Sequence, residues 1–427
     1  MGKGPRLNGT AKTAATRARR RLKGDSKSAL VLGGGGFTGG VYEIGALRAI
    51  DLLAVNRTVN DFDIYVGTSS GSFVGSMVAN GVTPEEMMRV LNKALPSPIP
   101  DPTLRNLLRP NYVAFAGHMA LLPLRLVGIA RQLAGNIGEI SMMDVAMSIA
   151  EGLPSGIYNN KGLERYMAEV LSEDGRTNDF RQLKNELLIT TTDVDTTERL
   201  VLGKDEWSDI PISTAVAAST ALPIVYEPFE LRGRQLMDGG IASTTNVDVA
   251  VEAGAELILV VNPLVPFVND FSSKIPTVFG SRVRRVSDMG LPGIGNQAFR
   301  LMAHARLKLA VESWKHRFPG VDIVLIEPEP DDELMFGTSI LDYSSRLKIA
   351  RHGFESVTNA LARDYDHLKS LTARHGIEIS PRRVKQVLDT VEEEEAGENS
   401  VWRRVLEQTT GALLRQSRER ETTASSN

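Results

Sequence analysis

Three small groups of residues in this 427-residue chain have types and spacings suited to nucleophilic chemistry. The first is Ser69, which lies in a GxSxG pattern over residues 67–71. An apolar β-type run precedes it and an apolar helical pattern follows it, so the motif predicts a sharp strand-to-helix turn with an exposed serine hydroxyl. Glycine at Gly67 and Gly71 suits such a turn, because neighbouring backbones leave no room for a Cβ. The alternative is a turn of small residues without catalysis, since GxSxG often occurs by chance.

The second group is a run of four glycines, residues 33–36, between an apolar strand-like run and a helical pattern. Bare N–H groups at a helix N-terminus attract negative charge. One candidate charge is a dinucleotide pyrophosphate, because Gly34, Gly36 and Gly39 match GxGxxG. The other is the oxyanion of acyl transfer, held by the amides around Gly34, Gly35 and Gly36. A nucleophile on the next strand favours the oxyanion hole.

The dinucleotide alternative would make the protein a nucleotide-binding α/β protein such as a dehydrogenase. That class uses an acidic residue at the end of its second strand. Here Asp61 and Asp63 lie before the second predicted strand segment instead. The sequence therefore favours this alternative less than acyl transfer.

The third group is Asp238, the first residue of an Asp-Gly-Gly sequence that ends a hairpin-like stretch over residues 229–238. A glycine loop, then GxSxG, then Asp-Gly-Gly, in this order, resembles the patatin-like phospholipase family. Residues 187–201 resemble the central strand pair of that family, and residues 217–223 its small-residue helix and proline turn. The resemblance spans about residues 28–262.

The resemblance implies a three-layer α/β/α fold with a mostly parallel central sheet and a helical insertion after the nucleophile helix. It also implies an ester hydrolase with a Ser-Asp dyad and no histidine, metal or cofactor. By this analogy Ser69 is the nucleophile, Asp238 is its base, and the amides around Gly34, Gly35 and Gly36 form the oxyanion hole. The implied substrate is a phospholipid or another fatty acyl ester, cleaved as by a phospholipase A or lysophospholipase. A carboxylate is a weak base for serine, so we expect burial to raise the pKa of Asp238.

The chain departs from the family pattern directly after the glycines. Members usually carry Lys or Arg there, whereas this chain has Phe37-Thr38-Gly39-Gly40. Two interpretations remain open: backbone amides alone stabilise the oxyanion, or Thr38 supplies a substitute donor. The missing cation also keeps open a non-catalytic role as an adaptor at a lipid surface.

A Ser-Asp-His triad is a further alternative, because five histidines follow Asp238. None of them lies in the short glycine-bounded loop after a strand that a triad histidine favours. We interpret all of them, and His118 before Asp238, as surface or helix-packing residues. The five are His304, His316, His352, His367 and His375.

The composition shifts along the chain predict three regions. Residues 1–27 carry nine Lys or Arg against one acid, which indicates a disordered tail or a polybasic segment attracted to anionic lipid headgroups. Residues 28–375 form the hydrolase domain, with a proline-punctuated, lid-like helical insertion at 96–150 and a flexible loop at 265–295. Residues 376–427 hold an acidic stretch, a short amphipathic helix and a disordered end.

Composition excludes several classes of function. The chain has no cysteine, which excludes disulfides, thiolate catalysis and cysteine-ligated zinc. A net charge of -3 argues against nucleic acid as a partner. We expect neither a signal peptide nor a transmembrane helix, and thus a cytoplasmic protein with transient contact to a membrane surface. Oligomeric state is left open.

Overall fold

The computed structural model describes residues 26–92, 154–269, 280–330 and 344–380, with short pieces between and after them (99, 108–112, 116, 117, 120, 127, 271, 274–277, 332, 334, 335, 382, 383 and 386). The predicted insertion at 96–150 falls almost wholly outside these residues. So do most of the N-terminal tail and most of the C-terminal region. These three predictions stay predictions.

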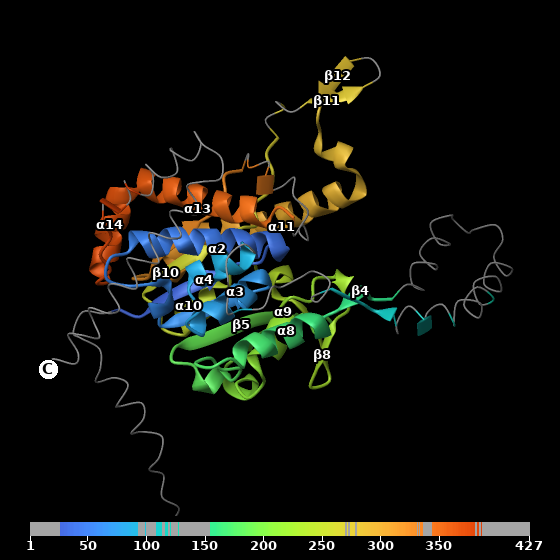
Figure 1. Ribbon diagram of the computed structural model, residues 1–427, viewed down its shortest axis with the longest axis horizontal. Coiled ribbons are helices and arrows are strands. Elements are labelled where there is room, and N and C mark those ends of the chain that lie inside the picture. Colours follow the sequence, from blue (N-terminus) through green and yellow to red (C-terminus); the bar gives the residue numbers. More distant parts are fainter. Residues whose placement is uncertain are drawn as a thin grey trace, which may run out of the picture.

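A mixed sheet forms the centre of the molecule (Figure 1). In the described part of the chain, strands β13, β10, β1, β2 and β5 run parallel in that order. Antiparallel β9 and β8 continue beyond β5, which also pairs with β6. The strands are β1 (Ser28–Leu32), β2 (Ile64–Thr68), β5 (Glu186–Asp193), β6 (Arg199–Leu202), β8 (Phe229–Leu231), β9 (Arg234–Asp238), β10 (Leu257–Val261) and β13 (Asp322–Ile326). The predicted mostly parallel sheet is confirmed.

Helices cover both faces of this sheet, because strand residues alternate between two apolar cores. Leu30 and Leu32 face one core, whereas Ala29 and Val31 face the other. The first core holds α2 (Gly36–Leu53), α3 (Ser70–Ala79), α4 (Pro84–Leu91), α8 (Lys161–Leu171), α9 (Ile212–Ser219) and α13 (Arg346–Arg363). The second holds α10 (Val247–Glu252) and α11 (Gly290–Arg317). The fold is therefore the predicted three-layer α/β/α arrangement.

Smaller elements lie at the edges. A short sheet joins β3 (Arg109–Pro110), β4 (Gly156–Asn159) and β7 (Ile224–Tyr226), and α14 (Tyr365–Arg374) follows α13. No helix in the described residues is long and apolar enough to cross a bilayer.

The segment 265–295 differs from the loop predicted there. It contains an antiparallel hairpin of β11 (Lys274–Thr277) and β12 (Gly280–Val283), which stands away from the sheet in Figure 1. Helix α11 then begins at Gly290, within the predicted loop. Pro and Gly suggested a loop, but Pro292 lies in the first turn of α11, where a proline costs no hydrogen bond.

Candidate functional site

Ser69 occupies the tight turn between β2 and α3. Its backbone has φ 54° and ψ -124°, a conformation that costs a non-glycine residue about 1–3 kcal/mol. The flanking glycines are required by close packing. A Cβ on Gly67 would lie 2.5 Å from the Cα of Ser72, and one on Gly71 would lie 2.3 Å from the carbonyl oxygen of Leu32. The turn therefore has the geometry that the GxSxG pattern predicts.

Asp238 ends β9 beside Ser69, although the two are 169 positions apart in the chain. Strand β5 brings them together, because it pairs with β2 at Thr190–Thr68 and with β9 at Thr191–Asp238. The Oγ of Ser69 donates a hydrogen bond of 2.5 Å to Oδ2 of Asp238. The sheet register thus places the predicted nucleophile and base in direct contact.

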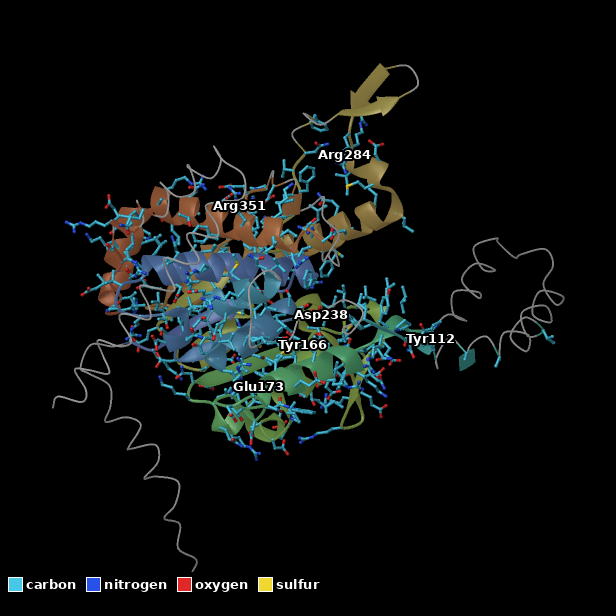
Figure 2. All side chains as sticks on the ribbon, viewed as in Figure 1. Tyr112, Tyr166, Glu173, Asp238, Arg284 and Arg351 are labelled. Atoms are coloured by element: carbon cyan, nitrogen blue, oxygen red, sulfur yellow. The ribbon has the colours of Figure 1, made fainter. Side chains whose placement is uncertain are left out.

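The Asp238 side chain is buried, with 4% of its surface exposed. Figure 2 shows it where the blue helices of the N-terminal region meet the green helices. Burial raises the pKa of Asp238 to about 6, although hydrogen bonds from Ser69 and the Gly240 amide lower it in part. The Gly240 N–H donates to Oδ1 at 2.8 Å. At pH 7 this carboxylate remains mostly ionised, and it is a stronger base than an exposed aspartate.

Buried hydroxyl and amide groups hold the turn from behind. The Ser69 N–H donates to Oγ of Ser219 at 2.9 Å, and that hydroxyl donates to the Thr190 carbonyl at 2.7 Å. Asn246 donates to the Thr68 and Thr190 hydroxyls at 2.9 and 3.0 Å. We did not assign roles to these residues from sequence. Asn246 has φ 44°, a conformation in which Asn is enriched, but this preference alone did not indicate its partners.

The glycine loop forms one wall of a small pocket at Ser69 and Asp238, which we call the dyad pocket. Gly34, Gly35 and Gly36 line it together with Ser69 and Asp238. A Cβ on Gly34 would lie 3.1 Å from the Ser69 Cβ, so a larger residue would crowd the nucleophile. The three amides have no acceptor among the described residues, and they lie at the N-terminus of α2. Such donors suit a transient negative charge.

Thr38 does not supply the substitute donor that we considered. Its side chain is buried and its hydroxyl reaches back to the Gly35 carbonyl at 3.5 Å, an interaction within the first turn of α2. No Lys or Arg belongs to the described lining of the dyad pocket. Among the described residues of the glycine loop that line this pocket, the hydrogen-bond donors are backbone amides.

A larger apolar cavity also includes Ser69 in its lining. Residues of α2, α3, α4 and α8 line it, and the stacked rings of Phe73 and Tyr166 form part of its wall. Apolar side chains dominate its surface, among them Phe37, Val41, Met77, Met87 and Leu163. A hydrocarbon chain attached to a carbonyl at Ser69 would find an apolar environment here.

No described histidine lines either cavity at Ser69. His352 bonds with Asp332, and His375 bonds with Asp322 at 2.7 Å, so these two form side-chain pairs away from the dyad. His316 and His367 are exposed, His304 is half-buried, and His118 lies outside the described residues. Among the residues that the structure describes, no group of acidic or histidine side chains has the arrangement of a metal site.

Comparisons with known proteins found one matching family model and several similar solved structures. The family model for patatin-like phospholipases matches residues 30–251. No curated protein matches the chain. Solved structures that are similar include VipD from Legionella pneumophila, at 14% identity and TM-score 0.34, with 79% of this chain and 67% of that chain covered. The type III effector protein ExoU is similar at 15% identity and TM-score 0.34, covering 79% of this chain.

The chain spans about half of ExoU, 53% of its length. The family match covers all three motifs that resembled the family in the sequence, from the glycine loop to Asp238. This match favours the lipid-hydrolase interpretation of the glycine loop over the dinucleotide-binding alternative. The protein belongs to the patatin-like phospholipase family.

Proposed function

We propose that this protein is a serine lipid acyl hydrolase of the phospholipase A or lysophospholipase type, with Ser69 as nucleophile and Asp238 as base. The observation that carries the proposal is the 2.5 Å contact between Ser69 Oγ and Asp238 Oδ2 at the junction of two cavities. Family membership supports an activity on lipid acyl esters. Phospholipids and other fatty acyl esters are the proposed substrates, reached by transient contact with a lipid surface.

In the first half-reaction, Ser69 Oγ attacks the ester carbonyl carbon while its proton passes to Oδ2 of Asp238. The carbonyl electrons move onto oxygen, and the amides around Gly34, Gly35 and Gly36 stabilise that oxyanion. The intermediate collapses when the bond to the alcohol oxygen breaks. Asp238 returns the proton to the departing alcohol, and the acyl group stays on Ser69.

In the second half-reaction, water attacks the acyl-enzyme and gives its proton to Asp238. Collapse releases the fatty acid and restores the Ser69 hydroxyl. The buried environment of Asp238 supports both steps, because a pKa of about 6 suits a group that accepts and returns a proton near neutral pH.

The test is Ser69→Ala, assayed on p-nitrophenyl esters and on phospholipid vesicles. We expect kcat to fall by at least about 1000-fold, because the nucleophile is lost. A matched control is Ser76→Ala on the same helix, whose buried hydroxyl donates only to the Ser72 carbonyl, at 2.6 Å. It should stay active on both substrates.

Equal activity of the wild type and Ser69→Ala would overturn the proposal. A fluorophosphonate probe provides a second readout, since it should label Ser69 in the wild type and nothing in Ser69→Ala. Vesicle binding by a protein that neither hydrolyses esters nor reacts with the probe would instead identify a lipid-surface adaptor.

A further inference from the structure

Asn296, from the beginning of α11, lines the dyad pocket more than fifty positions after Asp238 in the sequence. This pocket is the smaller of the two cavities at Ser69. Apart from the Ser-Asp pair, Asn296 is the only residue in its described lining whose side chain carries a hydrogen-bond donor. The lining comprises Gly34, Gly35, Gly36, Ser69, Leu222, Asp238, Gly240, Leu264, Asn296 and Phe299.

The Asn296 amide has a defined orientation. Its Oδ1 accepts a hydrogen bond of 3.2 Å from Nε of Arg300, one helical turn later. A guanidinium can only donate, so the oxygen of the amide must face Arg300 and the NH₂ group must face away from it. The described residues provide no acceptor for that NH₂ group. Asn296 is half-buried, so the group remains accessible to a bound ligand.

Arg300 is itself held firmly. It is 1% exposed, and its two terminal nitrogens donate to the carbonyls of Val265, at 2.8 Å, and Met335, at 3.0 Å. Burial lowers the pKa of Arg300 to about 10, so the side chain is still charged at neutral pH. Charged donors make the stronger hydrogen bonds. The side chain therefore locks the Asn296 amide against rotation.

The two cavities that meet at Ser69 can bind the acyl part and the alcohol part of an ester separately. They share only Gly36, Ser69 and Leu222 in their described linings, and Asn296 belongs to the dyad pocket alone. An acyl chain in the large apolar cavity leaves the alcohol part of the ester in the dyad pocket. The NH₂ group of Asn296 is then on the side of the leaving group.

Resting on the proposed function, the structure assigns to Asn296 the recognition of the alcohol part of the substrate. Its NH₂ group donates to an oxygen beside the ester bond, such as a glycerol or phosphoglycerol oxygen. It makes no bond to a leaving group that has no oxygen there. Arg300 is a positioning residue, which acts through Asn296.

The experiment compares two esters with the same acyl chain, p-nitrophenyl hexanoate and 1-hexanoylglycerol. We expect Asn296→Leu, which keeps the side-chain volume, to lower kcat/KM on the glycerol ester about 5- to 10-fold, the effect of one lost hydrogen bond. The p-nitrophenyl ester, whose leaving group offers no such oxygen, should lose less, so the ratio of kcat/KM on the glycerol ester to kcat/KM on the p-nitrophenyl ester should fall. The ratio of the two constants is independent of the amount of folded enzyme, so partial misfolding of a variant does not affect it.

The matched control is Gln297→Leu on the next position of α11. Its amide bonds to the Phe267 N–H, at 3.1 Å, and to the Phe267 carbonyl, at 2.7 Å, outside the dyad pocket. The ratio should keep its wild-type value in this variant. An unchanged ratio in Asn296→Leu, or an equal loss on both esters, would overturn the assignment.

Arg300→Lys tests the positioning role. Lysine keeps the charge but has one nitrogen, which cannot bond to Asn296, Val265 and Met335 in the same geometry. The ratio of kcat/KM on the glycerol ester to kcat/KM on the p-nitrophenyl ester should fall, as in Asn296→Leu. The double variant should have the same ratio as Asn296→Leu alone. A further fall in the double variant would show that Arg300 acts independently of Asn296. If the wild type hydrolysed neither ester, that result would instead contradict the proposed function itself.

Discussion

Two buried carboxyl groups, Asp238 and Glu43, differ in their partners and not in their burial. Asp238 is 4% exposed and Glu43, in α2, is 0% exposed. Burial raises the pKa of both. Asp238 accepts hydrogen bonds from Ser69 and Gly240. Neither oxygen of Glu43 has a partner within hydrogen-bond distance among the described residues, and the nearby Gly33 backbone opposes the rise of its pKa.

The comparison shows what burial contributes to a base and what it does not. Desolvation raises a pKa wherever it acts, so a raised pKa alone does not identify a functional carboxyl. The partners decide the role. Asp238 contacts a hydroxyl that opens on two cavities, whereas Glu43 belongs to the described lining of neither cavity. This contrast supports the proposed role of Asp238 as base, whereas Glu43 is a buried carboxyl group of the core.

The largest effect that separates the two groups is on turnover. Asp238→Asn keeps the shape of the side chain but removes its basicity, so kcat on a p-nitrophenyl ester should fall about 10²- to 10⁴-fold. Glu43→Gln keeps the shape of a side chain that lines neither cavity and should leave kcat unchanged. Steady-state kinetics on both purified variants checks this. A large loss of kcat in Glu43→Gln would contradict the separation of roles.

The pH dependence of kcat/KM sharpens the comparison. The active form needs ionised Asp238, whose pKa is about 6, so kcat/KM should fall about tenfold per pH unit below that value. Glu43→Gln should have the same profile, since Glu43 does not take part in proton transfer. A shift of the midpoint in that variant would show that the two carboxyl groups are coupled.

The smallest effect is on stability, and it has a defined sign. The pKa of Glu43 is raised in the folded state, so the fold binds this proton more tightly than the unfolded chain does. Its contribution to stability is present in full below the unfolded pKa, near about 4.3, and is lost as pH rises through the folded pKa. Glutamine does not titrate, so Glu43→Gln does not lose stability in this way as the pH rises. We expect the Tm difference between the variant and the wild type to increase from pH 5 to pH 8.

Differential scanning calorimetry across this range measures that difference. Asp238→Asn is the internal reference, because the pKa of Asp238 is raised only to about 6 and its share of the effect should level off above that pH. A Tm difference for Glu43→Gln that is independent of pH would mean that Glu43 is not protonated in the fold.

Local patterns in the sequence predicted the turn and the loop well. The apolar β-type run expected before Ser69 forms β2 (Ile64–Thr68), and the apolar helical pattern after it forms α3 (Ser70–Ala79). The GxSxG turn was predictable because steric crowding acts between close neighbours in the chain, apart from the approach of Gly71 to Leu32. Within 265–295, where proline and glycine suggested a loop, the structure has β11, β12 and the first residues of α11, since the same residues also occur at the start of helices.

The sequence by itself determined the candidate catalytic side chains, the local turn at Ser69 and the glycine-bearing start of α2. The turn and the helix start were predictable because they depend on nearby residues and backbone sterics. Only the tertiary structure decided their partners. The register of β5 against β2 and β9 joins Ser69 to Asp238, and the packing of α11 brings Asn296 and Arg300 to the same pocket. The burial that raises the pKa of Asp238 and Glu43 was likewise decided there, because desolvation depends on atoms supplied by distant segments.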